Sequence, residues 1–338
     1  MAPPSSISPD YLESTQKYSN GGKEHGGSTL AILGCGAMGT AILLGILSAQ
    51  ANRSEKGAVS LLPSRFMACV RRAETGDSIR SKLASQTLDS AVTVYTNKNV
   101  AAVREADMVL LACQPHVYRP LLEEPGMSAA LVGKPIMSVL AGVTSEEIEH
   151  HLEIIAARNN GRSDNGDSSG AFLVMRVMPN VASAVQASST VLEVRPPQHP
   201  RPLPKHLEAT AHAIFSCVGT VFATRPDTFA ICTTLNGSTP AFFAMVMDGL
   251  VDGAVALGLS HTEAIKMAAA TMRGTADLVL SGKSTQDLRY EVACPGGATM
   301  QGLRVLEESR TRAVWMDATR AATCEQSVLG SGLKVQRD

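Results

Sequence analysis

Short apolar runs alternate with helix-like segments through the first half of this chain. The runs have the length and aliphatic character of buried strands, and they lie at residues 29–33, 65–70, 92–95, 108–112 and 136–140. Segments with a helical spacing of apolar residues separate them, at residues 40–50, 74–85, 100–106 and 145–157. Further strands are expected at residues 172–178 and 189–194. This alternation predicts a parallel, doubly wound α/β sheet.

The second half of the chain is helical in its pattern. Residues 195–204 contain five prolines, which can sustain neither a helix nor an interior strand, so we place a domain boundary there. Beyond it, periodicity predicts helices at residues 242–257, 261–280, 284–292, 298–308 and 311–326. The expected organisation is an α/β domain over residues 28–200, followed by an all-α domain over residues 201–338. The first long helix has little polar cover, which favours pairing with a second copy of the chain.

Two segments fit neither domain. Residues 1–27 are rich in Pro, Ser and Gly, and they are expected to form a disordered tail. Residues 158–170 are polar and rich in Gly and Asn, so they are expected to form a mobile surface insertion away from the chemistry.

Composition narrows the range of partners. The formal net charge is −1 and the basic residues are scattered, so neither nucleic acid nor an anionic membrane is an expected partner. No apolar run approaches the ~20 residues of a membrane span, and the first residues do not read as a targeting segment, which favours a cytoplasmic protein. Seven Cys without a CxxC pair and eight His without ligand spacing predict buried thiols in a reducing compartment and no metal site.

A glycine-rich hexapeptide leads from the first predicted strand into the first predicted helix. Its residues are Gly34, Cys35, Gly36, Ala37, Met38 and Gly39. The three glycines permit a sharp turn, close approach of the backbone to a pyrophosphate, and tight packing of helix on strand. Amides at the positive end of the helix dipole can then hold the phosphates. This context predicts a Rossmann-type dinucleotide-binding domain, and the alternative is a glycine-rich turn without a ligand.

Two adjacent arginines follow the second predicted strand. At this place an acid would bind a ribose 2′-hydroxyl, whereas a base would bind a 2′-phosphate. Arg71 and Arg72 together can clamp a phosphate, so we expect NADPH as the coenzyme, with NADH binding more weakly. The alternative is that both side chains are solvated surface charges. Residues 112–115 and 141–142 also end strands at the edge where such sheets bind ligands.

Residues 291–307, EVACPGGATMQGLRVLE, closely resemble the signature of pyrroline-5-carboxylate reductases. The GCGAMG turn, the segment RVMPN at 176–180 and the segment LNGSTPAF at 235–242 agree with that family in order and spacing. The resemblance covers residues 28–328. It implies an enzyme of proline biosynthesis that reduces Δ1-pyrroline-5-carboxylate to L-proline with NAD(P)H. It also implies a homodimer interlocked through the helical domain, often assembled further into rings.

The resemblance assigns roles to residues of this chain. The residues implied to border the coenzyme, beyond the turn and the two arginines, are Asn99, Ala112, Gln114, Pro115, Met178, Pro179 and Asn180. Thr233 falls at the catalytic position, where a hydroxyl approaches the ring nitrogen of the substrate. The residues implied to bind the substrate are Asn236, Ser238, Gly296, Gly297, Ala298 and Thr299.

Elementary chemistry is consistent with these roles. A protonated cyclic imine is already an electrophile, so the protein needs chiefly to position its carbon. The Pro-Gly-Gly-Ala-Thr turn before a helix exposes amides that can bind a carboxylate, although it can also be a plain helix start. The hydroxyl of Thr233 can bond to the nitrogen as it becomes an amine, although it can also be a buried or capping hydroxyl.

Several residues depart from the family pattern. Asn236 and Thr239 are bulkier than the usual Ser and Gly, Gln114 replaces Lys, and Val181-Ala182 replaces Thr-Pro. These departures leave two alternatives open: a reductase of a substituted or six-membered imine acid in specialised metabolism, and a non-catalytic NADP-binding protein.

A β-hydroxyacid dehydrogenase would share this organisation. That class needs a catalytic Lys on an interdomain helix, beside a Gly-rich stretch and an Asn. The lysines after the predicted boundary lack that setting; they are Lys205, Lys266, Lys283 and Lys334.

Overall fold

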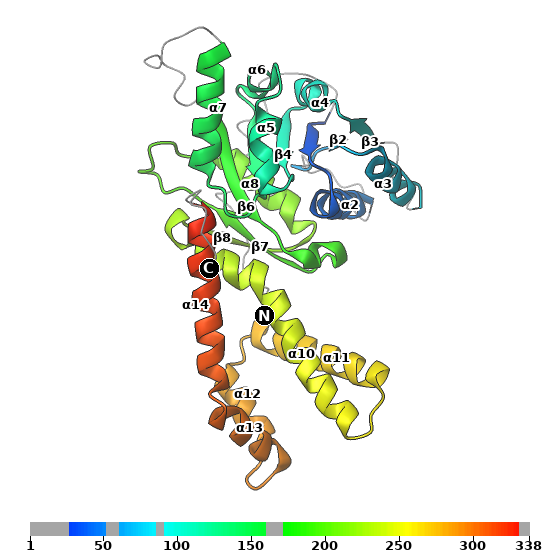
Figure 1. The fold of residues 1–338 in the computed structure, drawn as a ribbon, viewed down its shortest axis with the longest axis vertical. Coiled ribbons are helices and arrows are strands. Elements are labelled where there is room, and N and C mark those ends of the chain that lie inside the picture. The colour runs from blue at the N-terminus through cyan, green and yellow to red at the C-terminus, as the bar shows by residue number, and fades with distance from the viewer. Residues whose placement is uncertain (1–26, 52–60, 86–90, 160–171, 331–338) are drawn as a thin grey trace, which may run out of the picture. The chain divides into compact units, whose positions relative to one another are not determined.

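The computed structural model describes residues 27–51, 61–85, 91–159 and 172–330, and Figure 1 shows its ribbon. The chain divides into two compact units. One contains the residues up to Gly237 together with those from Gln326 onward, and the other contains Ser238–Glu325. The tail expected over residues 1–26 and the insertion expected over residues 160–170 lie outside the described residues. Arg158 and Asn159, which we assigned to that insertion, instead end a helix.

A single eight-stranded sheet forms the centre of the first unit, in the order β3-β2-β1-β4-β5-β6-β7-β8. The strands up to β6 are parallel, β7 is antiparallel to β6, and β8 is parallel to β7. Their bounds are β1 (Thr29–Leu33), β2 (Arg65–Val70), β3 (Val92–Thr96), β4 (Met108–Leu111), β5 (Pro135–Ser138), β6 (Leu173–Met178), β7 (Ser188–Glu193) and β8 (Gly219–Thr224). The order confirms the predicted Rossmann-type fold, because the sheet winds outward in both directions from β1 and β4.

Helices cover both faces of this sheet (Figure 1). One face packs against α2 (Ala37–Ala51), α3 (Ala73–Ser85) and α8 (Lys205–Ser216). The other face packs against α4 (Asn99–Glu105), α5 (Tyr118–Leu122), α6 (Met127–Leu131) and α7 (Ser145–Asn159). The predicted helix at residues 40–50 begins earlier than expected, so the last three residues of the glycine motif form its first turn.

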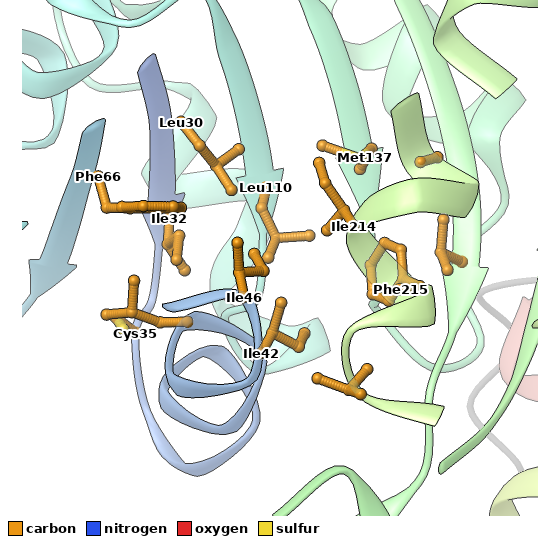
Figure 2. Packing of buried hydrophobic residues seen from close by; sticks show 14 of the residues in the cluster. Leu30, Ile32, Cys35, Ile42, Ile46, Phe66, Leu110, Met137, Ile214 and Phe215 are labelled. Carbon is orange, nitrogen blue, oxygen red and sulfur yellow. The ribbon is translucent and has the colours of Figure 1, made fainter. Parts of the chain in front are cut away.

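Alternating side chains of each strand enter different cores. Leu30 and Ile32 of β1 face the α2 side, whereas Ala31 and Leu33 face the α7 side. Figure 2 shows the first core, where Leu110 and Met137 from the sheet meet side chains of two helices that are far apart in sequence. Those helical side chains are Ile42 and Ile46 of α2 and Ile214 and Phe215 of α8. The core therefore extends across the proline-rich segment.

Residues 205–237 belong to the first unit rather than to a separate helical domain. Helix α8 follows Pro204 directly, and β8 pairs with β7 over its whole length, from Ser188 opposite Gly219 to Glu193 opposite Thr224. We expected only helices here and placed the boundary at residues 200 and 201, whereas the compact units divide at Gly237. The proline-rich segment therefore connects two parts of one unit, because the α8 and β8 that follow it supply apolar side chains to the sheet core.

A buried ion network joins α7, β6 and β7 to the proline-rich segment, which contributes Arg195 and also Arg201, whose Nη1 lies 3.3 Å from Glu149 Oε2. The side chains of Arg195 and Glu149 are fully buried, and Arg195 Nη2 lies 2.9 Å from Glu149 Oε1. Arg195 Nη2 also donates to the carbonyl of Val174, and Glu149 Oε1 accepts from the Val174 amide. Glu193 lies 3.5 Å from Arg195 Nε. Burial raises the pKa of the Glu193 carboxyl, while its bond from Ser145 and the nearby arginines oppose that rise.

The second unit contains helices α10 to α14. They are α10 (Thr239–Ala256), α11 (His261–Leu280), α12 (Thr285–Val292), α13 (Ala298–Glu308) and α14 (Thr311–Gly330), the last of which extends beyond this unit. Ser260 caps α11, because its side chain accepts from the amide of Glu263. Among the described residues of this unit, Val251 and Ala264 are the only buried apolar side chains. The unit therefore lacks an apolar core of its own.

One helical stretch is long enough and apolar enough to cross a membrane, as judged from its length and composition alone. Pro226–Ala256 satisfies that test of length and hydropathy, and only 6% of its most apolar window is buried within the chain. Our expectation that no apolar run approaches this length is therefore wrong. The helix that we expected at residues 242–257 begins earlier, at Thr239, and it follows directly on α9 (Phe229–Thr233) and the π-helix η5 (Thr234–Ser238).

We predict that Arg195→Ala lowers the free energy of unfolding by about 3–5 kcal/mol, because it leaves the carboxylate of Glu149 buried without its main counterion. Urea denaturation followed by circular dichroism measures this change. The matched control is Arg80→Ala, which removes an exposed pair with Asp77 and is expected to cost about 1 kcal/mol or less. Equal losses in the two variants would contradict the structural role of the buried network.

Candidate active site

The glycine-rich turn lies where the carboxyl ends of β1 and β4 meet. Gly34 has a φ of 79°, and a Cβ added there would lie 2.5 Å from the Cα of Cys113. Gly39 packs against β1, since an added Cβ would lie 3.0 Å from Ile32 Cγ2. At Gly36 the nearest atom to an added Cβ is the carbonyl oxygen of Gly34, 3.9 Å away. The turn is thus closed on its protein side and open at Gly36, as a pyrophosphate requires.

Amides at the start of α2 face this opening. In an α-helix the first N–H groups have no intrahelical acceptor, and the helix dipole makes that end positive. Gly36 and Ala37 are exposed, while the amides of Cys35 and Gly36 donate to the carbonyls of Cys69 and Gly34 and fix the turn. The residues present therefore fit a dinucleotide phosphate group.

Three thiols line the inner side of the turn. Burial raises the pKa of Cys35 to about 11, of Cys69 to about 12 and of Cys113 to about 11. All three are therefore neutral thiols at pH 7, acting as small apolar groups under the coenzyme turn. They supply packing, not a nucleophile.

The predicted coenzyme residues lie along the same edge. Arg71 and Arg72 are exposed directly after β2, and neither guanidinium forms an ion pair with any residue that the structure describes. Gln114 is exposed after β4, at the start of η2 (Pro115–Val117). Asn99 begins α4, and its side-chain amide donates to Glu124 Oε1 at 2.6 Å. That amide is thus already engaged within the protein.

Residues 178–180 leave the carboxyl end of β6 and are braced by η5. The side-chain amide of Asn236 donates to the carbonyl of Met178, and Asn180 Nδ2 donates to the carbonyl of Asn236 at 3.2 Å. Asn180 Oδ1 accepts from the amide of Ala182, capping η3 (Val181–Val185). The Asn180 side chain is therefore used at both ends as a structural brace, in a segment that the resemblance placed beside the nicotinamide.

Two buried polar atoms beside this brace have no hydrogen-bond partner among the described residues. They are the hydroxyl Oγ1 of Thr233 and the side-chain carbonyl Oδ1 of Asn236, in residues that are 3% and 2% exposed. An unsatisfied buried polar group costs about 1–3 kcal/mol, so such groups are rare unless a ligand completes them. Both atoms fall on residues that the sequence assigned to the substrate.

The helix α9 that carries Thr233 is held on the sheet by contacts that sequence reasoning missed. Phe229 packs with Met178 and Val191, and the guanidinium carbon of Arg176 lies 4.1 Å from the Phe229 ring centre. Arg176 also lies 3.9 Å from Glu193 of the buried network. Burial lowers the pKa of Arg176, and Glu193 opposes that change. The RVMPN motif contained Arg176, but nothing in the sequence indicated Phe229 as its partner.

The predicted carboxylate-binding turn belongs to the second unit. Gly296 has a φ of 73°, and Gly297 caps α13 while its own amide donates to the carbonyl of Cys294 at 2.9 Å. Ala298 and Thr299 are exposed in the first turn of α13, where amides lack intrahelical acceptors. Ser238, also in this unit, is the final residue of η5. The turn by itself has the features of an anion-binding nest.

Known families match two parts of the chain. Residues 226–329 match the family described as pyrroline-5-carboxylate reductase dimerisation. Residues 29–142 match the family described as NADP oxidoreductase, coenzyme F420-dependent. The first match covers the helices that lack their own core, and the second covers the glycine-rich turn and the strands up to β5.

Individual proteins are similar over nearly the whole chain. The Delta-1-pyrroline-5-carboxylate reductase kk1I of Curvularia clavata is 43% identical over 320 residues, covering 90% of this chain and 97% of that protein. A solved pyrroline-5-carboxylate reductase of Coxiella burnetii is 26% identical with a TM-score of 0.71, covering 90% and 99%. The Plasmodium falciparum pyrroline carboxylate reductase with NADP bound shares the fold, at 21% identity and a TM-score of 0.67, covering 90% and 98%.

We predict that Gly36→Ala leaves the protein folded but weakens binding of the dinucleotide at least about tenfold, or about 1.4 kcal/mol. The added methyl group meets only an ordinary van der Waals contact within the protein, 3.9 Å from the Gly34 carbonyl oxygen, but it occupies the surface that the phosphates approach. Coenzyme fluorescence titration and thermal unfolding measure the two effects. Gly34→Ala is the contrasting variant, expected to lose stability because of its φ and its contact with Cys113. Unchanged coenzyme affinity in Gly36→Ala would contradict this position for the phosphates.

Proposed function

The chain belongs to the pyrroline-5-carboxylate reductase family, and from that premise we propose that it reduces Δ1-pyrroline-5-carboxylate to L-proline with NADPH. The observation that carries the proposal is the pair of buried polar atoms, Thr233 Oγ1 and Asn236 Oδ1, which lie beside the end of β6 and have no hydrogen-bond partner among the described residues. In Rossmann-type sheets, ligands bind outside the carboxyl ends of the strands. NADPH supplies the hydride when it is bound, and the residues of this chain position and recognise the imine.

Each group of residues has a distinct task in this function. The turn of residues 34–39 holds the pyrophosphate, and Arg71 with Arg72 holds the 2′-phosphate. Met178, Pro179 and Asn180 border the nicotinamide, with Asn99, Ala112, Gln114 and Pro115 bordering the adenosine half. Gly296, Gly297, Ala298 and Thr299 form the turn that binds the substrate carboxylate, with the amides of Ala298 and Thr299 free of intrahelical acceptors, and Ser238 also binds the substrate. Thr233 is the catalytic residue, since its hydroxyl meets the ring nitrogen.

The active form is a homodimer joined through residues 226–329. Support comes from the match to a dimerisation family and from the exposed apolar side chains of this region. Leu257, Leu280 and Tyr290 are 91%, 72% and 82% exposed within one chain. Burying such side chains between subunits stabilises an assembly. Rings of dimers are a further expectation from the family.

We place the enzyme in the cytoplasm, with the apolar stretch Pro226–Ala256 in a subunit interface rather than a membrane. Asp248 and Asp252 lie within α10, where a bilayer would penalise them. The same stretch belongs to the region that matches the dimerisation family.

The test of this function is oxidation of NADPH by the purified protein with a panel of imine acids. We expect turnover with Δ1-pyrroline-5-carboxylate and formation of L-proline. A specific observation favours a second candidate: Asn236 and Thr239 occupy positions where the family usually has Ser and Gly. A preference for substituted or six-membered imine acids would support that specialised activity. Coenzyme binding with no imine-dependent oxidation across the panel would overturn both and identify a non-catalytic NADP-binding protein.

We predict that Thr233→Val lowers kcat on the order of 10²-fold without weakening NADPH binding, because the catalytic hydroxyl is lost. Replacing a buried, unpartnered hydroxyl with an apolar group of the same shape should leave the melting temperature unchanged or raise it. Thr233→Ser should restore most of the activity. The control is Thr234→Val, since the neighbouring Thr234 hydroxyl bonds back to the carbonyl of Ala230. Full activity in Thr233→Val would rule out a catalytic hydroxyl at this position.

We predict that replacing both Arg71 and Arg72 with Ala weakens NADPH binding about 10- to 100-fold and leaves NADH binding nearly unchanged. Only NADPH carries the 2′-phosphate, and hydrogen bonds to a charged group contribute about 1.5–3 kcal/mol. Titration with each coenzyme measures the change. Arg65→Ala is the matched control, because Arg65 is exposed at the opposite end of the same strand. An unchanged preference in the double variant would show that the 2′-phosphate binds elsewhere.

A further inference from the structure

The orientation of the Asn236 side chain is determined by its neighbours. Its amide nitrogen donates to the carbonyl of Met178, and its backbone carbonyl accepts from Asn180 Nδ2 at 3.2 Å. Turning the side-chain amide over would set Oδ1 against the Met178 carbonyl, so that two acceptors would face each other. The nitrogen therefore stays on the protein side. The remaining atom, Oδ1, is buried without a partner among the described residues.

This atom imposes a chemical requirement on any ligand that meets it. An amide carbonyl only accepts hydrogen bonds, whereas the hydroxyl of a Ser, usual at this position in the family, both donates and accepts. A neutral cyclic imine acid offers no donor at its ring nitrogen, but its protonated form offers one N–H. We propose that Asn236 Oδ1 accepts a hydrogen bond from the ring nitrogen of the substrate, so that this site selects the protonated imine. This inference rests on the proposed function and specifies which form of the substrate is bound.

The inference divides the recognition of one nitrogen between two residues. The proton on the imine comes from solvent before binding, and Asn236 Oδ1 holds that N–H. When hydride forms the new C–H bond, the π electrons of the C=N bond move to nitrogen as a lone pair. The hydroxyl of Thr233 then donates to this lone pair, and a second proton from solvent completes the secondary ammonium of the product. Thr233 therefore needs no shifted pKa, and neither residue changes its own charge.

The decisive experiment compares two ligands that differ at one ring atom, both in its hydrogen-bonding character and in its charge. L-Proline carries N–H donors, whereas tetrahydrofuran-2-carboxylate has a ring oxygen that only accepts. We expect the wild-type enzyme with NADP⁺ bound to prefer proline in calorimetric titrations. Asn236→Leu should reduce the ratio of the two dissociation constants about tenfold or more, because a hydrogen bond to a charged donor is lost. Asn236→Ser should reduce the ratio by a smaller factor, since a hydroxyl can serve either ligand.

The ratio of the two dissociation constants distinguishes loss of the proposed hydrogen bond from general damage to the site. Loss of the Asn236 bond to Met178 would weaken both ligands together, leaving the ratio unchanged. Thr234→Val is the matched control and should retain the wild-type ratio. An unchanged ratio in both Asn236 variants, or equal affinity of the wild-type enzyme for the two ligands, would overturn the inference.

The pH dependence of substrate KM supplies a second measurement. The inference predicts that KM of the wild-type enzyme rises as the pH passes above the pKa of the imine, because the neutral form lacks the donor. In Asn236→Ser the rise should be weaker, since the hydroxyl can donate to the neutral nitrogen. Identical pH profiles would contradict the inference while leaving the reductase activity established. Absence of activity in the wild-type enzyme would instead contradict the proposed function.

Discussion

The hydrogen bonds between η5 and the carboxyl end of β6 hold the site together. Asn236 donates to the carbonyl of Met178, and Asn180 returns a bond to the carbonyl of Asn236. These bonds attach a segment of π-helix, an uncommon conformation that is frequent at functional sites, to the edge of the sheet. By satisfying one end of the Asn236 amide, they leave the other end, Oδ1, as a buried acceptor without a partner among the described residues. A small structural brace therefore determines which polar atom is presented to the substrate.

The sheet provides a rigid base for this brace. The turn at Gly34 approaches Cys113 so closely that the ends of β1 and β4 form one continuous edge. Further along the sheet, Arg176 stacks on Phe229 and pairs with Glu193, which belongs to the buried network of Arg195 and Glu149. These contacts connect β6, β7, α7 and α9. The charged side chains among them are buried, so they contact one another in place of water. Removing Arg195 would leave Glu149 with Arg201 alone and Glu193 with Arg176 alone, so both buried carboxylates would lose part of their compensation.

The helical unit, unlike the sheet, has almost no apolar core within one chain. With only Val251 and Ala264 as buried apolar side chains among its described residues, its helices are not stabilised by a core within one chain. The match to a dimerisation family explains why so many apolar residues face outward in the monomer. Because the proposed carboxylate turn at residues 296–299 lies in this unit, subunit assembly and substrate binding are expected to depend on the same helices.

The sequence by itself determined the Rossmann-type fold, the glycine-rich turn and the apolar helices, because each depends on local spacing of residue types. Periodicity could not identify β8, since Gly219–Thr224 becomes a strand only by pairing with β7. Nor could the proline-rich segment reveal that α8 rejoins the core on its far side. The tertiary structure alone decided that Arg195 is a buried ion rather than a surface residue, and which atom of Asn236 remains unpartnered. Burial and hydrogen bonding depend on segments far apart in the chain, and local sequence does not record which of them meet.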